Sequence, residues 1–413
     1  MMDIFKKKNS IYFIPIFLIF SYFTGFILNE NSSVGAYNDF LIHLNTSQEV
    51  KNGILNFLLK YDEYGNAHSP VFIIILDLVN IGENTFIARL FSLIVSLLIP
   101  IIFLKSMELK YNLNDKLFLV YLSCFFFISP YFRSLAFWPG SENLSIIFFL
   151  AAIFYFLKFN KSINNINEIK YIFLNVFFLA LASYIRPIYC IFSLFFFYEI
   201  ILKYYTHKKL IYYLIFNLLL SLPAIYYVFI LEIYFFDTLF NSNTNLVTKA
   251  GFTYTVVFFY LTPFIFFYKD LYFEKYKLIT FLSLILFIIF IFFFKYETLT
   301  GGGFYYNLFV KYFENTTLFF IISFISIVCV NLFLNLKIKS NLILFFILFL
   351  LEADSQFYQE TFDPILFIMF FTMFELKFIN KLINSKNIKK INFIFLYLLT
   401  FYFISLYKSI FLV

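Results

Sequence analysis

The run FIARLFSLIVSLLIPIIFLKSM, residues 86–107, decides the fold class of this chain. It can cross a lipid bilayer, because an α-helix of about twenty apolar residues spans the hydrocarbon core. Similar runs recur along the sequence, which is 62% hydrophobic and only 13% charged, whereas about a quarter of the residues in soluble domains are charged. The pattern therefore predicts a single all-α polytopic membrane domain over residues 1–413.

The predicted fold has about 11–13 transmembrane helices. The candidate spans are residues 11–28, 86–107, 116–132, 142–159, 170–186, 188–205, 210–232, 253–270, 278–294, 316–336, 341–352, 363–377 and 391–407. The first follows Lys6-Lys7-Lys8 and has no small-residue cleavage site, so we expect a retained span rather than a cleaved signal peptide. The three cysteines lie far apart within such runs and predict neither a disulfide nor a metal site.

Lysines mark one side of the membrane. They gather at every second connection between the candidate spans, in residues 6–8, 105–116, 158–170, 203–209, 269–277, 337–339 and 377–390. Cytoplasmic loops carry an excess of Lys and Arg, so these connections and the N-terminus are predicted to be cytoplasmic. The net charge of +7 then indicates topology and attraction to anionic membrane lipids, not a nucleic-acid partner.

The remaining connections are predicted to be extracytoplasmic. The largest, residues 29–85, contains a polar island with two of the chain's three histidines. The island's ionisable side chains are Asp39, His43, Asp62, Glu63 and His68. A short apolar run at residues 71–79 is too brief to cross the membrane and predicts a helix lying along its surface.

The chain has only three arginines, and each lies at the predicted outer end of a span, where cations are disfavoured. They are Arg89, Arg133 and Arg186. Arginine binds phosphate through two parallel hydrogen bonds and stays charged when partly desolvated. The pattern favours an outer site for an anionic, phosphate-bearing ligand. The alternative is that each arginine extends to the outer headgroups or pairs with an acid such as Glu83 or Glu142.

A series of short motifs runs through residues 36–161. They are Ala36-Tyr37-Asn38-Asp39, Ala67-His68-Ser69-Pro70-Val71, Gly82-Glu83-Asn84, Ala88-Arg89-Leu90, Ser129-Pro130-Tyr131-Phe132-Arg133 and a span start near Glu142. In this order they resemble the GT-C class of membrane glycosyltransferases. The resemblance is greatest to the bacterial, family 39-like branch related to protein mannosyltransferases and to the aminoarabinose transferase of lipid A. That branch has Asp-Glu where this chain has Asn38-Asp39, and Pro-Pro where it has Ser69-Pro70.

The resemblance implies a transferase of a bacterial inner (plasma) membrane with its active site on the extracytoplasmic face. Such an enzyme moves a sugar from a polyprenyl-phosphate donor to a lipid, glycan or protein acceptor. Asp39 is then the expected general base, and the arginines are expected to hold the donor phosphate. No cofactor or metal-ligand cluster is predicted, although a divalent ion near Asp39 stays open.

Each candidate in the first loop also has a plainer interpretation. Asp39 precedes an apolar-periodic segment and could be a helix N-cap. His43 lies four residues further on, on the same helical face; it is a candidate for orienting the acid or contacting donor phosphate, or is a simple interfacial histidine. His68 is a candidate donor contact, or part of a helix start at Ser69-Pro70.

Tyr358 and Glu360, in the late outer loop 353–362, are candidate substrate contacts because related enzymes place such contacts in a late loop. Two other functions stay open, a flippase or transporter of lipid-linked sugars and an O-antigen-type polymerase. A transporter would favour internal repeats, broken helices and mid-membrane charges. A polymerase would have its main outer loop late in the chain, whereas the large loop here comes first.

Overall fold

The computed structural model describes residues 2–33, 35–80, 84–113, 115–162, 167–204, 208–234, 246–268, 276–296, 301–351 and 357–411. These ranges contain helices and no β-strand, which confirms the predicted all-α polytopic class. By length and composition, seven helices in them can cross a membrane, or eight if one bent helix pair forms a single span. At the other five predicted spans, the apolar helical stretches within the described residues are shorter. The shortest is α18 (Ile365–Thr372), which occupies the predicted span 363–377.

The chain forms two compact units, residues 1–235 with 395–413, and residues 236–394. The helices of the first unit are α1 (Met2–Ile27), α2 (Ala36–Gln48), η1 (Glu49–Asn52), α3 (Ile54–Leu59), η2 (Tyr61–Tyr64), α4 (Pro70–Val79), α5 (Thr85–Tyr111), α6 (Lys116–Ser123), η3 (Cys124–Ile128), α7 (Pro130–Phe137), α8 (Ser141–Lys161), α9 (Glu168–Ile185), η4 (Pro187–Ile191), α10 (Phe192–Tyr204), α11 (Lys208–Ile225) and the π-helical turn η5 (Tyr226–Ile230). The C-terminal part of α20 (Ile388–Phe411) also belongs to this unit.

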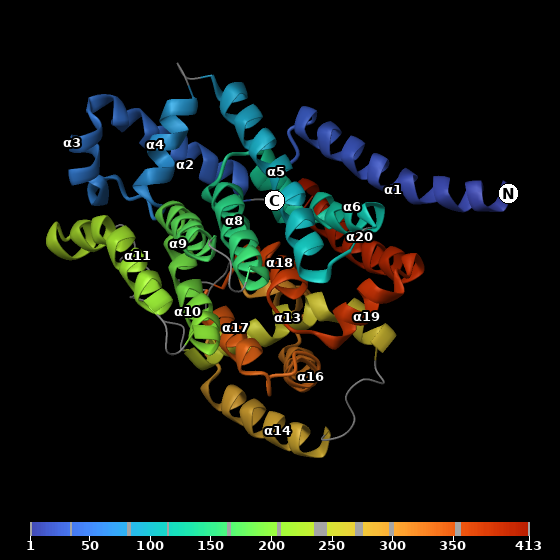
Figure 1. The fold of residues 1–413 in the computed structure, drawn as a ribbon. Helices are drawn as coiled ribbons and strands as arrows, with labels where there is room; N and C mark the ends of the chain where they lie inside the picture. Colours follow the sequence, from blue (N-terminus) through green and yellow to red (C-terminus); the bar gives the residue numbers. More distant parts are fainter. Residues whose placement is uncertain are drawn as a thin grey trace. The chain divides into compact units, whose positions relative to one another are not determined.

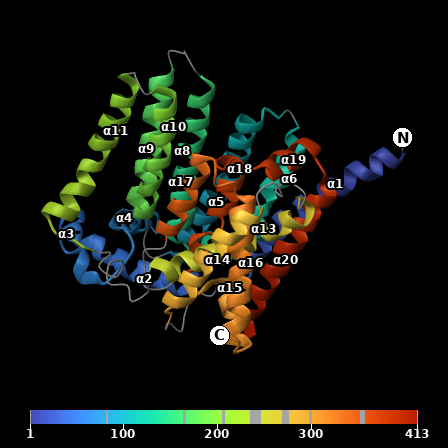
Figure 2. The same ribbon diagram turned by 90° about the horizontal axis from the view of Figure 1, so that it is seen from below.

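Helix α8 forms the centre of the first unit, packed between α5 and α9, and α11 packs on α9 (Figures 1 and 2). Buried amides join these helices. Asn143 Nδ2 donates to Ser96 Oγ at 2.8 Å, and Asn175 Nδ2 donates to the carbonyl oxygen of Ala152 at 2.9 Å. Such bonds stabilise helix packing in a membrane, where lipid is as apolar as the side chains that face it.

The connections between these helices alternate between two ends. Lys161 Nζ donates to Asn112 Oδ1, which brings together the lysine-bearing connections after α5 and after α8. Arg89 and Glu142 lie in the first turns of the same two helices. Because α5 has 27 residues and a helix rises 1.5 Å per residue, these ends are about 40 Å apart. We call the end with the arginine and the glutamate the loop end.

A sharp bend of 73° separates residues 116–128 from α7. Ser129 is extended, with φ −66° and ψ 120°, and its Oγ accepts a hydrogen bond from the Phe132 backbone N–H at 3.0 Å. Pro130 follows at the first helical position, where its missing N–H costs little. The local sequence thus ends one helix and starts another, which directs α7 and its Arg133 into the protein interior.

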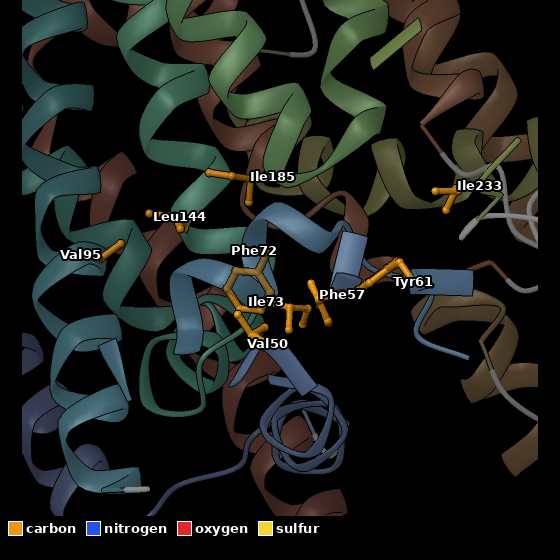
Figure 3. Packing of buried hydrophobic residues seen from close by; sticks show 9 residues of the cluster. All are labelled: Val50, Phe57, Tyr61, Phe72, Ile73, Val95, Leu144, Ile185 and Ile233. Atoms are coloured by element: carbon orange, nitrogen blue, oxygen red, sulfur yellow. The ribbon is translucent and has the colours of Figure 1, made fainter. Parts of the chain in front are cut away.

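The loop between α1 and α5 folds into short helices at the loop end. Its Val50, Phe57, Tyr61, Phe72 and Ile73 form one hydrophobic cluster with four side chains from later in the chain. The latter are Val95, Leu144, Ile185 and Ile233. Figure 3 shows Phe72 and Ile73 of α4 next to Val50 and Phe57. The helix predicted over residues 71–79 begins as expected, with Ser69 as the N-cap and Pro70 as the first residue.

The second unit contains α13 (Leu246–Tyr268), α14 (Tyr276–Phe293), α15 (Gly303–Tyr306), η8 (Asn307–Tyr312), α16 (Thr316–Phe333), α17 (Lys339–Leu350), η9 (Gln359–Thr361), α18, α19 (Lys377–Ser385) and the start of α20. Helix α13 packs against α14, α16 and α17. Tyr254 donates to Asn331 Oδ1 at 3.1 Å, and Asn331 Nδ2 donates to Ser283 Oγ at 3.0 Å. These bonds join α13, α16 and α14.

Candidate functional site

Asp39 lies in the first turn of α2, not at its N-cap. The helix begins at Ala36 after Gly35, and the Asp39 backbone N–H already donates to the Gly35 carbonyl at 3.0 Å. The N-cap interpretation is therefore wrong. The carboxylate is half-buried. Burial raises the pKa of Asp39 from 3.8 to about 6; the nearby Glu142 also raises it, and Arg186 opposes them.

Arg186 and Glu142 form an ion pair beside this carboxylate. Nη1 of Arg186 lies 3.2 Å from Oε1 of Glu142, and the two side chains are 20% and 10% exposed. Arg186 is extended because it precedes Pro187. Glu142 is in the first turn of α8, where the helix dipole favours a negative charge. The pair is thus fixed by two helix boundaries and stays in partial contact with solvent.

Glycine at position 140 makes room for the Glu142 carboxylate. A Cβ at this position would lie 2.6 Å from Glu142 Oε2 and 2.7 Å from Leu135 Cδ2. Both distances are shorter than real Cβ contacts, so any larger residue would displace the carboxylate or the leucine. The glycine thus leaves space for the glutamate carboxylate where it stands.

The two loop histidines lie against each other. The ring centroids of His43 and His68 are 4.3 Å apart, with the rings nearly perpendicular, and Nδ1 of His68 is 3.2 Å from Ser141 Oγ. Burial lowers the pKa of both rings; His68 contributes to the effect on His43, and for His68 the nearby Glu142 opposes it. Both side chains are therefore neutral at physiological pH.

Asn66 determines which nitrogen of His43 carries the proton. Its Oδ1 accepts a hydrogen bond from the His68 backbone N–H at 3.0 Å, which turns Nδ2 toward Thr46 Oγ1 at 3.1 Å and His43 Nδ1 at 3.4 Å. Because Nδ2 is a donor, Nδ1 of His43 accepts, and the proton is on Nε2. Within the described residues this buried Nε2 has no hydrogen-bond partner. His43 thus presents an uncharged N–H rather than a positive charge.

Arg133 is 1% exposed and pairs with Glu30. Its Nε donates to Oε1 at 2.8 Å, and its Nη2 donates to Oε2 at 2.5 Å. Further donors reach the carbonyl oxygens of Phe127 at 3.1 Å and of Ser21 at 3.0 Å. The ring of Tyr402 lies 4.8 Å from the guanidinium carbon. This arginine connects α1, α7 and α20 within the first unit.

Arg89 lies between two aromatic rings. Its Nε and Nη2 donate to the carbonyl oxygens of Phe137 and Phe26, each at 2.9 Å. Its guanidinium carbon is 4.8 Å from the ring centroid of Phe26 and 4.3 Å from that of Trp138. Trp138 also packs edge-on against Tyr37 of α2, at 4.7 Å between centroids. Arg89 thus supports the helix that carries Asp39.

The predicted site residues fall into three groups. Asp39, His43, His68 and Arg186 come together at the loop end with Glu142, and we call these five residues the Asp39 cluster. Arg89 and Arg133 lie in the same unit with the protein partners described above. The third group, Tyr358 and Glu360, belongs to the second unit, where Tyr358 directly precedes η9, Glu360 lies in it, and both are half-buried. The predicted turn at Gly82 and Glu83 lies outside the described residues.

Sequence reasoning missed three contributors. Glu142 was expected only as an arginine's partner, yet it also acts on Asp39. Asn66 gave no signal, because its role depends on a contact with His43 across the loop. Trp138 gave one signal that could have been used, since it is the chain's only tryptophan and lies between two candidate spans.

The Asp39 cluster combines a carboxylate able to take up a proton near neutral pH with one permanent cation. Neutral histidines leave Arg186 as the cluster's positive charge, so an anionic group arriving there would compete with Glu142 for it. Among the described residues, no three His, Cys, Asp or Glu side chains are close enough to hold a metal ion.

No protein-family model, no curated protein and no solved structure matches this chain.

Proposed function

We propose that this protein is a glycosyltransferase that moves a sugar from a polyprenyl-phosphate donor to an acceptor at the extracytoplasmic face of the membrane. Asp39 is its general base and Arg186 the cation that meets the donor phosphate. The observation that carries the proposal is the half-buried Asp39 carboxylate, with a pKa near 6, beside the Arg186–Glu142 pair.

A pKa near 6 suits a general base. A base works best when its pKa is close to the ambient pH, because it is then mostly ionised yet still basic enough to accept a proton. Asp62, an acid of the same loop, is exposed to solvent instead of half-buried. The burial of Asp39 therefore supports a role in proton transfer.

Arg186 supports the second half of the reaction. Its side chain is 20% exposed, whereas that of Arg133 is 2% exposed. Arginine binds phosphate oxygens through paired N–H donors and stays charged when partly desolvated. Negative charge grows on the phosphate as the sugar leaves, and a positioned cation stabilises that charge.

The proposed step is a substitution at the anomeric carbon. The acceptor oxygen forms a bond to that carbon, its proton passes to a carboxylate oxygen of Asp39, and the bond between the carbon and the phosphate oxygen breaks. The leaving group takes the bonding electron pair as polyprenyl phosphate. Because attack and departure occur on opposite faces, the configuration at the carbon inverts.

A second candidate function, transport of a lipid-linked sugar, is favoured by one observation. The 73° bend between residues 116–128 and α7 breaks a membrane helix, and broken helices are typical of transporter binding sites. The buried Arg133 lies just after the bend. An assay for the proposed function must therefore detect movement across the membrane as well as transfer.

The test uses the full chain in vesicles with a radiolabelled polyprenyl-phosphate sugar in one leaflet and an extract of acceptor lipids. We expect label to move from donor to acceptor with the wild type, and about 10²–10⁴-fold more slowly with Asp39→Asn. Asp62→Asn is the matched control, because it removes an exposed acid of the same loop. It should transfer at the wild-type rate.

The other outcomes separate the candidates. Label that crosses the bilayer unchanged, equally well with Asp39→Asn, would establish transport and refute the transferase. Equal transfer by both aspartate variants would remove Asp39 as the base.

A further inference from the structure

Helix α3 exposes apolar side chains on its free face. Ile54 is 50% exposed, Leu55 is 73% exposed and Leu59 is 48% exposed, while Phe57 on the opposite face is fully buried in the loop's hydrophobic cluster. Isolated exposed leucines are common on soluble surfaces. Three in six residues, on a helix whose other face is already packed, form a continuous patch that needs a partner.

The patch is tied to the end of a peripheral membrane helix. The hydroxyl of Tyr227 in η5 donates to the carbonyl oxygen of Leu58 in α3 at 2.8 Å. η5 ends the spanning stretch Leu210–Ile230, of which only 6% is buried inside the protein. Figures 1 and 2 both show α3 next to this end of α11. A span with so few buried residues faces lipid, so α3 lies where that lipid-facing surface ends.

Exposed lysines border the patch on both sides. Lys51 precedes α3 and Lys60 follows it directly. Cations that flank an apolar helix face are typical of segments that lie in the headgroup layer, where long side chains reach the phosphates while the apolar face enters the acyl boundary. The acids Glu49, Asp62 and Glu63 lie further along the chain on the two sides, so the attraction to anionic headgroups rests on the two lysines nearest the patch in sequence.

We propose that α3 docks in the headgroup layer of the membrane leaflet at the loop end. Leu55 and its two exposed neighbours enter the acyl boundary, and Lys51 and Lys60 contact anionic headgroups. The Tyr227 bond holds α3 at this level. The docked helix sets the height of the loop, and with it of the Asp39 cluster, above the hydrocarbon core. The inference does not depend on the proposed function.

The experiment places a nitroxide spin label on a cysteine at position 55 of the full chain, after Cys124→Ser, Cys190→Ser and Cys329→Ser. Leu55 is the most exposed of the three, so the label disturbs little packing. The matched control carries the label at Glu63, an exposed polar position on η2 of the same loop. Both proteins are reconstituted in vesicles of phosphatidylcholine and phosphatidylglycerol.

The measurement compares how often the nitroxide collides with oxygen, which concentrates in lipid, and how often it collides with a water-soluble nickel chelate. We expect the label at position 55 to collide mainly with oxygen and the label at position 63 to collide mainly with the nickel chelate. Equal nickel access at the two positions would overturn the proposal. Both labelled proteins must keep the apparent Tm of the unlabelled protein, so that an accessible label at position 55 reports the position of α3 and not unfolding.

A second measurement tests the lysines. Lys51→Gln with Lys60→Gln should raise nickel access at position 55 in vesicles with phosphatidylglycerol and leave it unchanged in pure phosphatidylcholine. An equal change in both lipids, or none in either, would contradict the assigned contact with anionic headgroups.

Discussion

Two Arg–Glu pairs of the first unit have the same chemistry and opposite surroundings. Arg133 and Glu30 have side chains that are 2% and 7% exposed, and the arginine also binds backbone carbonyls and aromatic rings. Arg186 and Glu142 are 20% and 10% exposed, and they lie beside Asp39. In each pair a glycine, Gly25 or Gly140, leaves space for the glutamate.

The difference shows how one residue type acquires two uses. Arg133 has its donors directed at the protein, so its charge supports the packing of three helices. Arg186 keeps solvent contact and a nearby carboxylate whose proton affinity it changes. The position of an arginine at a span end predicted a functional site for both, but their roles depend on burial and on the other groups in reach.

Breaking the buried pair should have the largest effect. Glu30→Gln leaves the Arg133 charge buried without its carboxylate, and the loss of one partner of a buried pair costs about 3–5 kcal/mol. We expect a strong fall in the apparent Tm in detergent and in the yield of folded protein. Glu142→Gln, the matched change in the pair that keeps some solvent contact, should cost less, because solvent screens part of that interaction. Equal losses would show that the two pairs do not differ as described.

The two glycines offer a sharper version of the same comparison. A Cβ at position 25 would lie 2.7 Å from Arg133 Nη2, inside a closed network, whereas at position 140 it would meet Glu142 Oε2 at 2.6 Å, near solvent. Overpacking typically costs about 1–3 kcal/mol. Thermal unfolding should place Gly25→Ala at the upper end of that range and Gly140→Ala at the lower. The reverse order would mean that the partly exposed pair is the more rigid.

Asp39→Asn should stabilise the protein at neutral pH. Burial, and then Glu142, raise the pKa of Asp39 from 3.8 to about 6, so the folded state binds the proton more tightly than the unfolded state. Stability therefore falls as pH rises between these values, and the ionised group costs about 1–3 kcal/mol above them.

The apparent Tm, measured between about pH 4 and pH 7, tests whether stability falls as pH rises. The wild type should lose stability with rising pH, and Asp39→Asn should show a weaker slope and a higher Tm at neutral pH. Asp62→Asn serves as the control. A wild-type slope that Asp39→Asn leaves unchanged would assign the titration to another group.

The smallest expected effect is a shift in pH dependence. Glu142→Gln removes a negative neighbour that raises the pKa of Asp39, although burial remains the larger cause. The same change also frees Arg186 from its carboxylate, which lowers that pKa further. If transfer is measured, the acid limb of kcat/KM should move to lower pH. A shift to higher pH would show that the charge of Glu142 does not raise the pKa of Asp39.

Much of the fold could be predicted from hydropathy, since each predicted span corresponds to a helix within the described residues. Periodicity did not reveal the bend at Ser129-Pro130, because the apolar run continues through it and only the serine cap and the proline mark the break. The alternative that Asp39 caps α2 placed the start of the helix too late, because Gly35 precedes it.

The candidate site was predicted in part. The polar loop and the three arginines stand out in the sequence because such residues are rare in it. The residues that they contact could not be predicted. Glu30 and Arg133 are 103 positions apart in sequence, and Arg186 meets Glu142 through the packing of α9 on α8. Such pairings depend on tertiary contacts, which no local pattern records.

Trp138 has a practical consequence. It is the chain's only tryptophan, its indole N–H donates to the Glu30 carbonyl at 3.0 Å, and its ring contacts both Arg89 and α2. The protein therefore carries a built-in fluorophore at the joint between its first loop and its long helices. A change in the emission of the unlabelled wild type on adding a donor lipid would report movement of that joint directly.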